Sequence, residues 1–148
     1  MKRADLLTFL CLALTVLCGG LLVCGFFFAP SALRLYAERT GRPESIVPGI
    51  LTAFYAAAPF ALAGMFFLAV LLVGVLRGEV FIRRNAVLLR LLALCALIAS
   101  VLCAAVGWRY LPLLLCAFVG FFLSVIVAVL SRLFFAAAEI KAENALTI

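Results

Sequence analysis

Four long apolar stretches constrain this chain more than any other feature of its sequence. They occupy residues 6–29, 50–76, 88–107 and 111–135. Each holds at least about 20 residues, the length that crosses a hydrocarbon core about 30 Å thick at about 1.5 Å per residue. Apolar residues cover every face, whereas strands of a transmembrane β-barrel alternate between apolar and polar residues. Because only helices and closed barrels span lipid, the sequence predicts an all-α integral membrane protein.

The composition agrees with a membrane protein of one domain. Apolar and aromatic residues make up 70% of the 148 residues, and charged residues make up 12%. A soluble domain has roughly half apolar and about a quarter charged residues. So few polar residues could not cover a water-exposed surface, and the length leaves no room for a separate soluble domain. We expect residues 1–148 to form a four-helix bundle of two antiparallel hairpins.

The first apolar stretch also has features of a secretory signal peptide, because Lys2 and Arg3 precede it. A signal peptide, however, has an apolar region of only about 7–15 residues, and this stretch is longer. The sequence therefore predicts a retained membrane anchor.

The basic residues predict which side of the membrane each connection faces. Those on the same side as the termini would be Lys2, Arg3, Arg77, Arg83, Arg84, Arg90, Arg132 and Lys141. Those on the opposite side would be Arg34, Arg39, Arg42 and Arg109. Under the positive-inside rule the larger group faces the cytoplasm, which predicts an N-in/C-in protein of a bacterial cytoplasmic (inner) membrane. The loop 77–87 and the tail 136–148 would be cytoplasmic, and the loop 31–49 and the turn 108–112 would face outward.

The outer loop 31–49 is the longest polar segment between two apolar stretches. Ser31 is placed to cap a short helix. The Thr-Gly-Arg-Pro sequence at residues 40–43 predicts a break, and Pro48 with Gly49 predicts the turn into the second span. We expect a small cap over the bundle, too short to fold independently.

Small residues indicate where helices approach each other, since close packing drives helix association in lipid. Two stripes recur every four residues: Ala96, Ser100 and Ala104 in the third span, and Cys116, Gly120, Ser124 and Ala128 in the fourth. We expect the stripes to face each other; the alternative is a homodimer face and hence a homo-oligomer. Pro59 lies inside the second span, where its missing amide hydrogen should kink the helix.

The residues that catalysis and metal binding need are missing from the spans. The chain has no histidine, and the centres of the four stretches hold no Asp, Glu, Lys or Arg. Neither a proton-coupled exporter nor a charge-lined pore fits such an interior. The six cysteines lie in apolar stretches without a C-x-x-C pair, so we expect them to pack as small residues. The sequence predicts no catalytic, metal or cofactor site and a non-enzymatic protein.

The cytoplasmic loop 77–87 holds distinctive residues. Phe81 is apolar among charges, and Arg83, Arg84 and Arg90 would suit anionic lipid headgroups at about 1 kcal/mol each. The loop either anchors the third span at the membrane surface or docks a protein. Direct binding of nucleic acid is not expected, because the basic residues flank the apolar stretches as headgroup anchors do.

The tail 136–148 should continue the fourth helix beyond the membrane, with Glu139 and Glu143 on a solvated helix end. Asn144 is placed to end that helix in a left-handed cap. The last residues favour β structure, and they would either fold back on the bundle or add to the sheet of a partner. The tail residues that would contact a partner are Glu143, Asn144, Leu146, Thr147 and Ile148.

The tail also carries a resemblance to a known family. Residues 139–148, Glu-Ile-Lys-Ala-Glu-Asn-Ala-Leu-Thr-Ile, resemble the closing pattern of the YoaS-like family of small bacterial membrane proteins. Other residues similar to that family's pattern are Arg132, Leu133, Tyr55, Pro59, Phe81 and Arg90. The resemblance covers most of the chain and implies four spans and a membrane location, but no activity. Members are often encoded beside a small helix-turn-helix regulator, which the resemblance suggests as a partner.

Two functions are compatible with these features. The first is a membrane protein whose cytoplasmic face docks a partner, because the distinctive residues gather there and the interior is chemically plain. The second is a binder or carrier of an apolar small molecule or lipid within the bundle, which would use the small residues and the Pro59 kink.

Overall fold

The computed structural model describes residues 3–41, 43, 45–108 and 111–146 of the chain. The described residues are helical apart from short connections, and they contain no strand. The helices are α1 (Arg3–Thr40), α2 (Ile46–Leu76), α3 (Arg83–Gly107) and α4 (Leu111–Leu146). Each of them is long and apolar enough to cross a membrane. The predicted all-α membrane bundle is confirmed.

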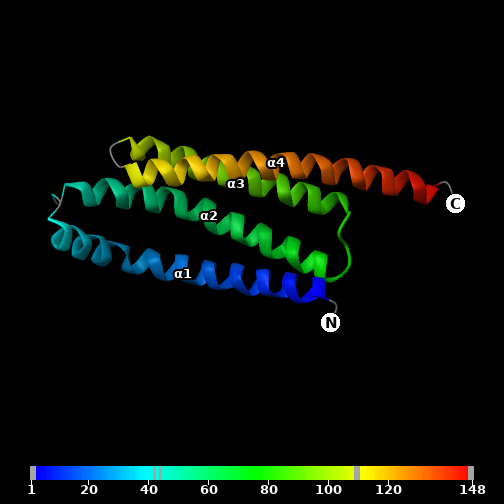
Figure 1. The fold of residues 1–148 in the computed structure, drawn as a ribbon, viewed down its shortest axis with the longest axis horizontal. Helices are drawn as coiled ribbons and strands as arrows, with labels where there is room; N and C mark the ends of the chain where they lie inside the picture. Colours follow the sequence, from blue (N-terminus) through cyan, green and yellow to red (C-terminus); the bar gives the residue numbers. More distant parts are fainter. Residues whose placement is uncertain (1–2, 42, 44, 109–110, 147–148) are drawn as a thin grey trace.

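The helices pack in chain order, as two antiparallel hairpins set side by side (Figure 1). α1 packs against α2, α2 against α3, and α3 against α4, and the contact between α3 and α4 is the most extensive. In the described part of the chain α1 touches no helix other than α2. Figure 1 places the start of α1, the α2–α3 connection and the end of α4 at one end of the molecule, called the terminal end below.

The predicted outer loop 31–49 is mostly helical, which corrects the expected cap at Ser31. α1 continues through Pro30 and Ser31 without a break and ends at Thr40. Proline is tolerated within membrane helices when a neighbouring group bonds the carbonyl that it frees. The expected Thr-Gly-Arg-Pro break does end α1, and Gly41 has a left-handed φ of 60° there.

The expected turn at Pro48 and Gly49 is also corrected, because α2 begins earlier, at Ile46. Both residues lie in the first turn of α2. The first amides of a helix have no acceptor within it, so a proline there costs no hydrogen bond. The Thr52 hydroxyl donates to the Pro48 carbonyl at 2.8 Å within this helix.

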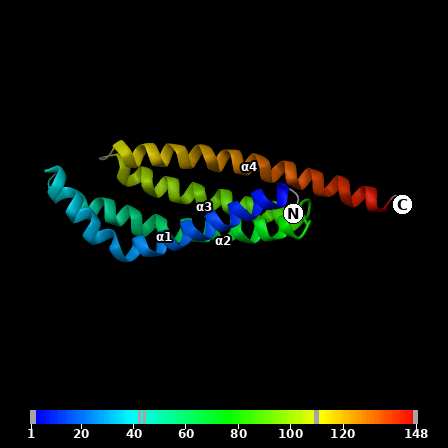
Figure 2. The same cartoon turned by 60° about the horizontal axis from the view of Figure 1, so that its bottom comes forward.

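A side chain of α2 compensates for Pro30 inside α1. Proline has no amide hydrogen, so the carbonyl of Phe26, four residues earlier, loses its helical donor. The hydroxyl of Tyr55 donates a hydrogen bond to this carbonyl at 3.1 Å. Figure 2 shows α1 bent between its blue N-terminal part and its cyan C-terminal part. The missing bond at Pro30 accounts for this bend.

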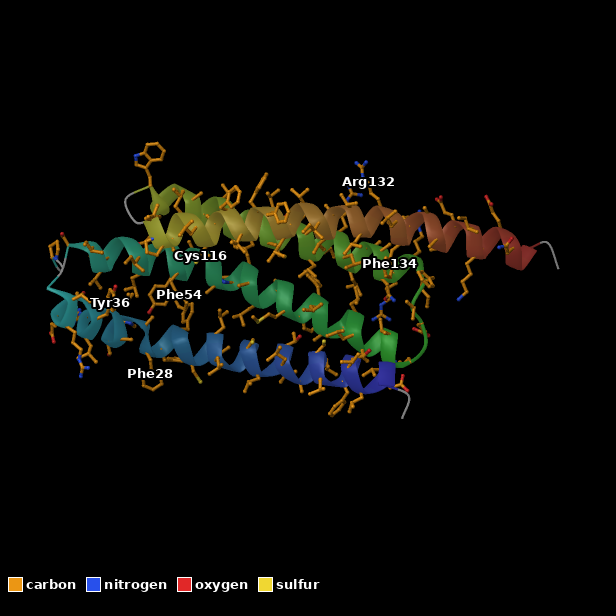
Figure 3. All side chains as sticks on the ribbon, viewed as in Figure 1. Phe28, Tyr36, Phe54, Cys116, Arg132 and Phe134 are labelled. Carbon is orange, nitrogen blue, oxygen red and sulfur yellow. The ribbon has the colours of Figure 1, made fainter. Side chains whose placement is uncertain are left out.

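Three aromatic rings form the contact between α1 and α2 at this point. The ring of Phe26 meets the ring of Tyr55 edge to face with centroids 4.6 Å apart, and Phe54 lies 5.8 Å from Tyr55. Figure 3 shows Phe54 between the two helices, whereas Phe28 points away from α2. Many other large side chains of α1 are exposed and suit contact with lipid, among them Leu6, Leu7, Phe9, Leu10, Leu14, Leu17, Leu21 and Phe27.

Small residues at seven-residue intervals form the seam between α3 and α4. On α3 they are Ala86, Ala93, Ser100 and Gly107, and on α4 they are Ala117, Ser124 and Ser131. The Ser124 hydroxyl donates to the Ala93 carbonyl at 2.8 Å. The Ser131 hydroxyl donates to the Ala86 carbonyl, also at 2.8 Å. The two bonds set the antiparallel register, and a seven-residue repeat keeps one helix face toward its neighbour.

This repeat differs from the predicted four-residue stripes. The stripe residues that the structure buries fully or partly are Ala96, Ser100, Ala104, Gly120 and Ser124. Cys116 and Ala128 are exposed. A stripe of every fourth residue turns about 40° around the helix at each step, because successive residues are about 100° apart. Both ends of such a stripe therefore leave the seam.

Two glycines determine how closely α3 and α4 approach. A methyl group on Gly120 would overlap the hydroxyl oxygen of Ser100. That hydroxyl is held by its own bond to the Ala96 carbonyl, 2.7 Å away. A methyl group on Gly107 would stand 2.9 Å from the backbone nitrogen of Leu114, closer than side-chain carbons normally come. Larger residues at either position would push the helices apart.

Asn85 organises the connection between α2 and α3. Its side chain is buried, and its amide donates hydrogen bonds to the carbonyls of Glu79 and Val80, the second at 3.0 Å. Gly74 on α2 leaves room for this side chain, since a Cβ there would stand 3.3 Å from Asn85 Oδ1. Gly78, at a φ of 80°, reverses the chain after α2. The connection is thus an ordered turn.

At the terminal end, two helix boundaries differ from those expected from the sequence. α3 begins at Arg83, so the non-helical connection is shorter than the predicted loop 77–87. α4 continues to Leu146 with Asn144 inside it, which corrects the predicted left-handed cap. The neighbours of Asn144 are alanine and glutamate, which favour helix strongly enough to carry it through. Pro59 lies within α2, which continues past it.

Candidate functional site

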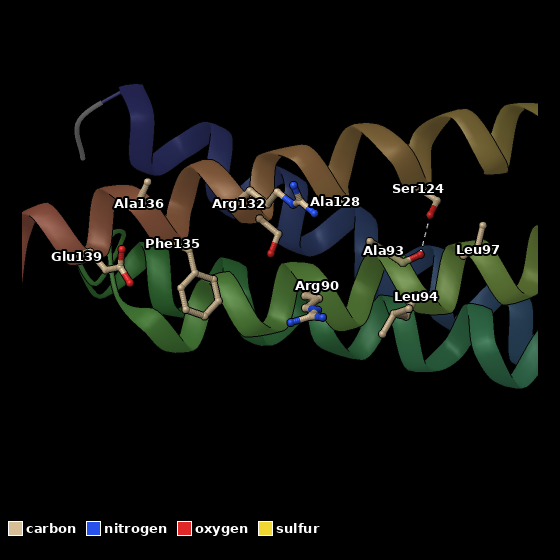
Figure 4. A pocket seen from close by; sticks show the side chains of 11 residues that line it. Arg90, Ala93, Leu94, Leu97, Ser124, Ala128, Arg132, Phe135, Ala136 and Glu139 are labelled. Atoms are coloured by element: carbon tan, nitrogen blue, oxygen red, sulfur yellow. Dashed lines mark hydrogen bonds between the residues drawn. The ribbon is translucent and has the colours of Figure 1, made fainter.

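A groove runs along the seam of α3 and α4 at the terminal end of the molecule (Figure 4). It has a volume of about 490 Å³ and takes its lining from these two helices alone. It combines apolar side chains with charged ones, and it is called the α3–α4 groove below. The residues that matter for its chemistry are Leu94, Leu97, Arg90, Arg132, Phe135 and Glu139.

Helical spacing puts these side chains on two facing stripes. Arg90, Leu94 and Leu97 follow each other at intervals of four and three residues on α3. Arg132, Phe135 and Glu139 do so at intervals of three and four on α4. Residues at such intervals lie on one face of a helix. The lining residues therefore form one face of α3 and one face of α4, each beside the seam.

The hydrogen bonds of the seam fix the walls of the groove. Ser124 and Ser131 line it and bond across to the backbone of α3, at Ala93 and Ala86. Arg90 lies between those two α3 positions, so its level falls between the levels of Ser124 and Ser131. Arg132 lies nearer the terminal end by about 7 Å, and Glu139 lies about 10 Å beyond Arg132.

The two arginines lean toward one level of the groove from opposite ends. The Cα–Cβ bond in a helix tilts toward the N-terminus, which is the terminal end for α3 and the far end for α4. Arg90 therefore leans toward the level of Arg132, and Arg132 leans toward the level of Arg90. In Figure 4 Arg132 reaches along the groove away from Glu139. The two guanidinium groups therefore lie at a similar level on opposite walls of the groove (Figure 4).

The charged groups of the groove are accessible. Arg90, Arg132 and Glu139 are all exposed. Among the residues drawn in Figure 4, a hydrogen bond is marked between Ser124 and Ala93, and none is marked to these three charged side chains. A further cation lies at the rim, because the Arg83 guanidinium stands over the Phe135 ring at 5.7 Å from its centroid.

A smaller groove of similar character lies between α2 and α3 at the same end. Its volume is about 250 Å³, and its charged lining residues are Arg77, Arg84 and Glu79. Phe66 and Val70 supply apolar walls. Both grooves at the terminal end thus combine arginines with apolar side chains.

Two other cavities lie farther along the helices and are almost wholly apolar. One, of about 290 Å³, is lined by residues that include Gly64, Cys95, Cys103 and Cys116, and the other holds about 360 Å³ beside Ala104. Within the described residues, no three His, Cys, Asp or Glu side chains gather closely enough to hold a metal ion.

The predicted site residues are distributed over three places. Arg90 lines the α3–α4 groove, and Arg84 lines the smaller groove. Phe81 packs its ring against Phe134, with centroids 5.5 Å apart. This contact holds the α2–α3 connection against α4. The exposed last turns of α4 carry Glu143 and Asn144. The side chain of Leu146, together with Thr147, Ile148, Lys2, Arg42 and Arg109, lies outside the described residues.

Sequence reasoning missed Arg132 and Glu139 as members of one site with Arg90. From the sequence, Arg132 reads as a topology signal and Glu139 as part of a solvated helix end. Their seven-residue spacing on α4 was the signal that could have joined Arg132 to Glu139.

Comparison with known proteins places the chain in a family without assigning an activity. A search of curated proteins and a search of solved structures found no match to the chain. The family described as "Protein of unknown function (DUF2975)" matches residues 5–148, nearly the whole chain. With its four apolar helices and this match, the chain belongs to the DUF2975 family of proteins of unknown function.

Proposed function

We propose that this protein binds a phospholipid in the α3–α4 groove and is not an enzyme. One observation carries the proposal: two exposed arginines, one on each wall, line a groove whose deeper part is apolar. A guanidinium group binds the oxygens of a phosphate with paired, charge-assisted hydrogen bonds. Leu94 and Leu97 would contact the first part of an acyl chain. This is the lipid-binding alternative that the sequence left open.

The position of the arginines supports this ligand. A charged side chain within the apolar length of a helix is costly unless it reaches the interface or finds a partner. The tilt of Arg132 directs its stem away from the terminal end and so away from the nearer water. A phosphate at the level of Arg90 and Arg132 would compensate both charges. The volume of the groove suits a headgroup and the upper acyl chain, since ligand pockets hold about 300–1,000 Å³.

Native mass spectrometry of the detergent-purified protein tests the proposal. The wild type should retain phospholipid, and the double variant Arg90→Gln, Arg132→Gln should lose most of it. Arg34→Gln with Arg39→Gln is the matched control, because these arginines are also exposed but lie on α1 at the other end of the molecule. Equal phospholipid retention by all three proteins would contradict a site in the α3–α4 groove.

The membrane placement belongs to the same proposal. We place the terminal end in the cytoplasm of a bacterium, with the chain in its inner membrane, because most of the basic residues gather at that end. We also propose that the chain belongs to the YoaS-like family, a narrower assignment that rests on the resemblance of its tail. A cysteine introduced at Arg83 in a cysteine-free background should react with a membrane-impermeant thiol reagent only after the cells are opened. Reaction in intact cells would reverse the topology.

A second candidate function is the docking of a cytoplasmic protein on the end of α4. This end projects beyond the α2–α3 connection in Figure 1, and its residues 141–144 are exposed. The partner would be a small regulator such as a helix-turn-helix protein, as the family resemblance suggests. Deleting residues 144–148 should abolish its recovery with the membrane protein. Unchanged recovery would remove the tail from consideration.

A further inference from the structure

We propose, on the basis of the phospholipid site above, that the α3–α4 groove selects phosphatidylethanolamine over other phospholipids. The lining of this groove changes in chemical character along its length. From the inside outward the lining is apolar at Leu94 and Leu97, cationic at Arg90 and Arg132, aromatic at Phe135 and acidic at Glu139. Phosphatidylethanolamine has the complementary order: acyl chains, then an anionic phosphate, then a cationic ammonium group at the outer end.

The arginines cannot distinguish one phospholipid from another. Every glycerophospholipid presents a phosphate at the same level, and this is the group that Arg90 and Arg132 meet. Discrimination must come from the residue that meets the distal part of the headgroup. Among the groove residues this is Glu139, about 10 Å farther out than Arg132 on the same face of α4.

A carboxylate at that position favours a primary ammonium group for two reasons. The charges are opposite, and the three N–H bonds of an ammonium group are donors, whereas a carboxylate is purely an acceptor. Choline carries the same positive charge but has no N–H bond to donate. The glycerol headgroup has hydroxyl donors but no positive charge, and the serine headgroup brings a second carboxylate into repulsion with Glu139.

The expected selectivity is modest because Glu139 is exposed. An exposed ion pair changes a binding constant by up to about fivefold. We therefore expect about fivefold enrichment of phosphatidylethanolamine over phosphatidylcholine. Successive N-methylation of the ethanolamine headgroup should lower the enrichment step by step, and this series needs no protein variant.

Competition in mixed micelles tests this selection. The delipidated full chain is given equal amounts of phosphatidylethanolamine, phosphatidylglycerol and phosphatidylcholine of distinct masses, and bound lipid is counted by native mass spectrometry. The wild type should enrich the ethanolamine lipid. Glu139→Gln should bring the three ratios close to one while total bound lipid stays the same. Glu38→Gln, an exposed glutamate on α1, is the matched control and should keep the wild-type ratios.

The outcomes separate this inference from the proposed function. If the wild type binds lipid without enrichment, or if Glu139→Gln keeps the enrichment, the selectivity is wrong but the phospholipid site stands. Enrichment of phosphatidylglycerol instead would show that the positive charge of the arginines, and not Glu139, determines which lipid is preferred. If Arg90→Gln with Arg132→Gln leaves bound lipid of all three kinds unchanged, the site itself is wrong and the selectivity falls with it.

Discussion

The Tyr55 hydroxyl on α2 and the Phe26 carbonyl on α1 lie 3.1 Å apart, so one helix supplies the donor that a proline removes from the other. Within lipid no water can replace such a donor. The bond therefore ties the bend of α1 to the position of α2. Pro30 is compatible with a continuous helix here because Tyr55 stands opposite the carbonyl that it frees.

Replacing Tyr55 with phenylalanine should lower the free energy of unfolding by about 1–2 kcal/mol, because the ring stays and the Phe26 carbonyl loses its donor. Unfolding in mixed SDS micelles would measure the change. In a Pro30→Ala background α1 regains its own amide donor, so the same tyrosine substitution should cost clearly less. An equal cost in both backgrounds would contradict the compensation.

The contact between Gly120 and Ser100 predicts a substitution with a specific rescue. Gly120→Ala should destabilise the α3–α4 hairpin by about 1–3 kcal/mol, because the new methyl group overlaps the Ser100 hydroxyl. Ser100→Ala removes that oxygen and leaves a Cβ–Cβ distance of 3.6 Å, which is an ordinary contact. The double variant should therefore recover much of the loss. A double-mutant cycle that shows simple additivity would rule out this contact.

The seam serines should contribute little each but measurably. Ser124→Ala and Ser131→Ala each remove one hydrogen bond between helices, and such bonds in membrane proteins contribute about 0.6 kcal/mol on average. Because the two bonds lie about 10 Å apart along the helix, their effects should add. Ser31→Ala, at an exposed position of α1, is the control and should be neutral in the same SDS unfolding assay.

Asn85→Ala should loosen the α2–α3 connection. The substitution removes the amide that donates to two loop carbonyls, and each such hydrogen bond contributes about 0.5–1.5 kcal/mol. Hydrogen exchange should accelerate in residues 77–82. Asn144→Ala changes an exposed asparagine of α4 and should leave that exchange unchanged. Slow exchange in the Asn85 variant would show that Gly78 and the helix ends order the turn alone.

The spans were predictable because length and uniform apolarity dominate everything else in lipid. Helix ends were harder, and Pro30, Pro48 and Asn144 show why. Each residue favours a break in water: a proline because the carbonyl that it frees finds a solvent donor, and an asparagine because its side chain competes for backbone hydrogen bonds. Here Tyr55 replaces that donor, the first turn of α2 does not need it, and strong helix formers flank the asparagine.

The candidate site was only partly predictable. The sequence indicated that Arg90 would meet headgroups, but its neighbours on α4 depend on the register of the hairpin. That register follows from the bonds of Ser124 and Ser131 to α3, which no pattern within a single helix reveals. Once the register is known, Arg132 and Glu139 follow from their spacing.

Each described helix packs only against the helices next to it in the chain, and this arrangement affects how the protein folds. Every described contact of α1 is with the segment that follows it, and the remaining helices add one after another to the edge of the row. No late segment has to return to an early one. The protein can therefore build up in the order in which it leaves the ribosome, each new span settling on the one already in the bilayer.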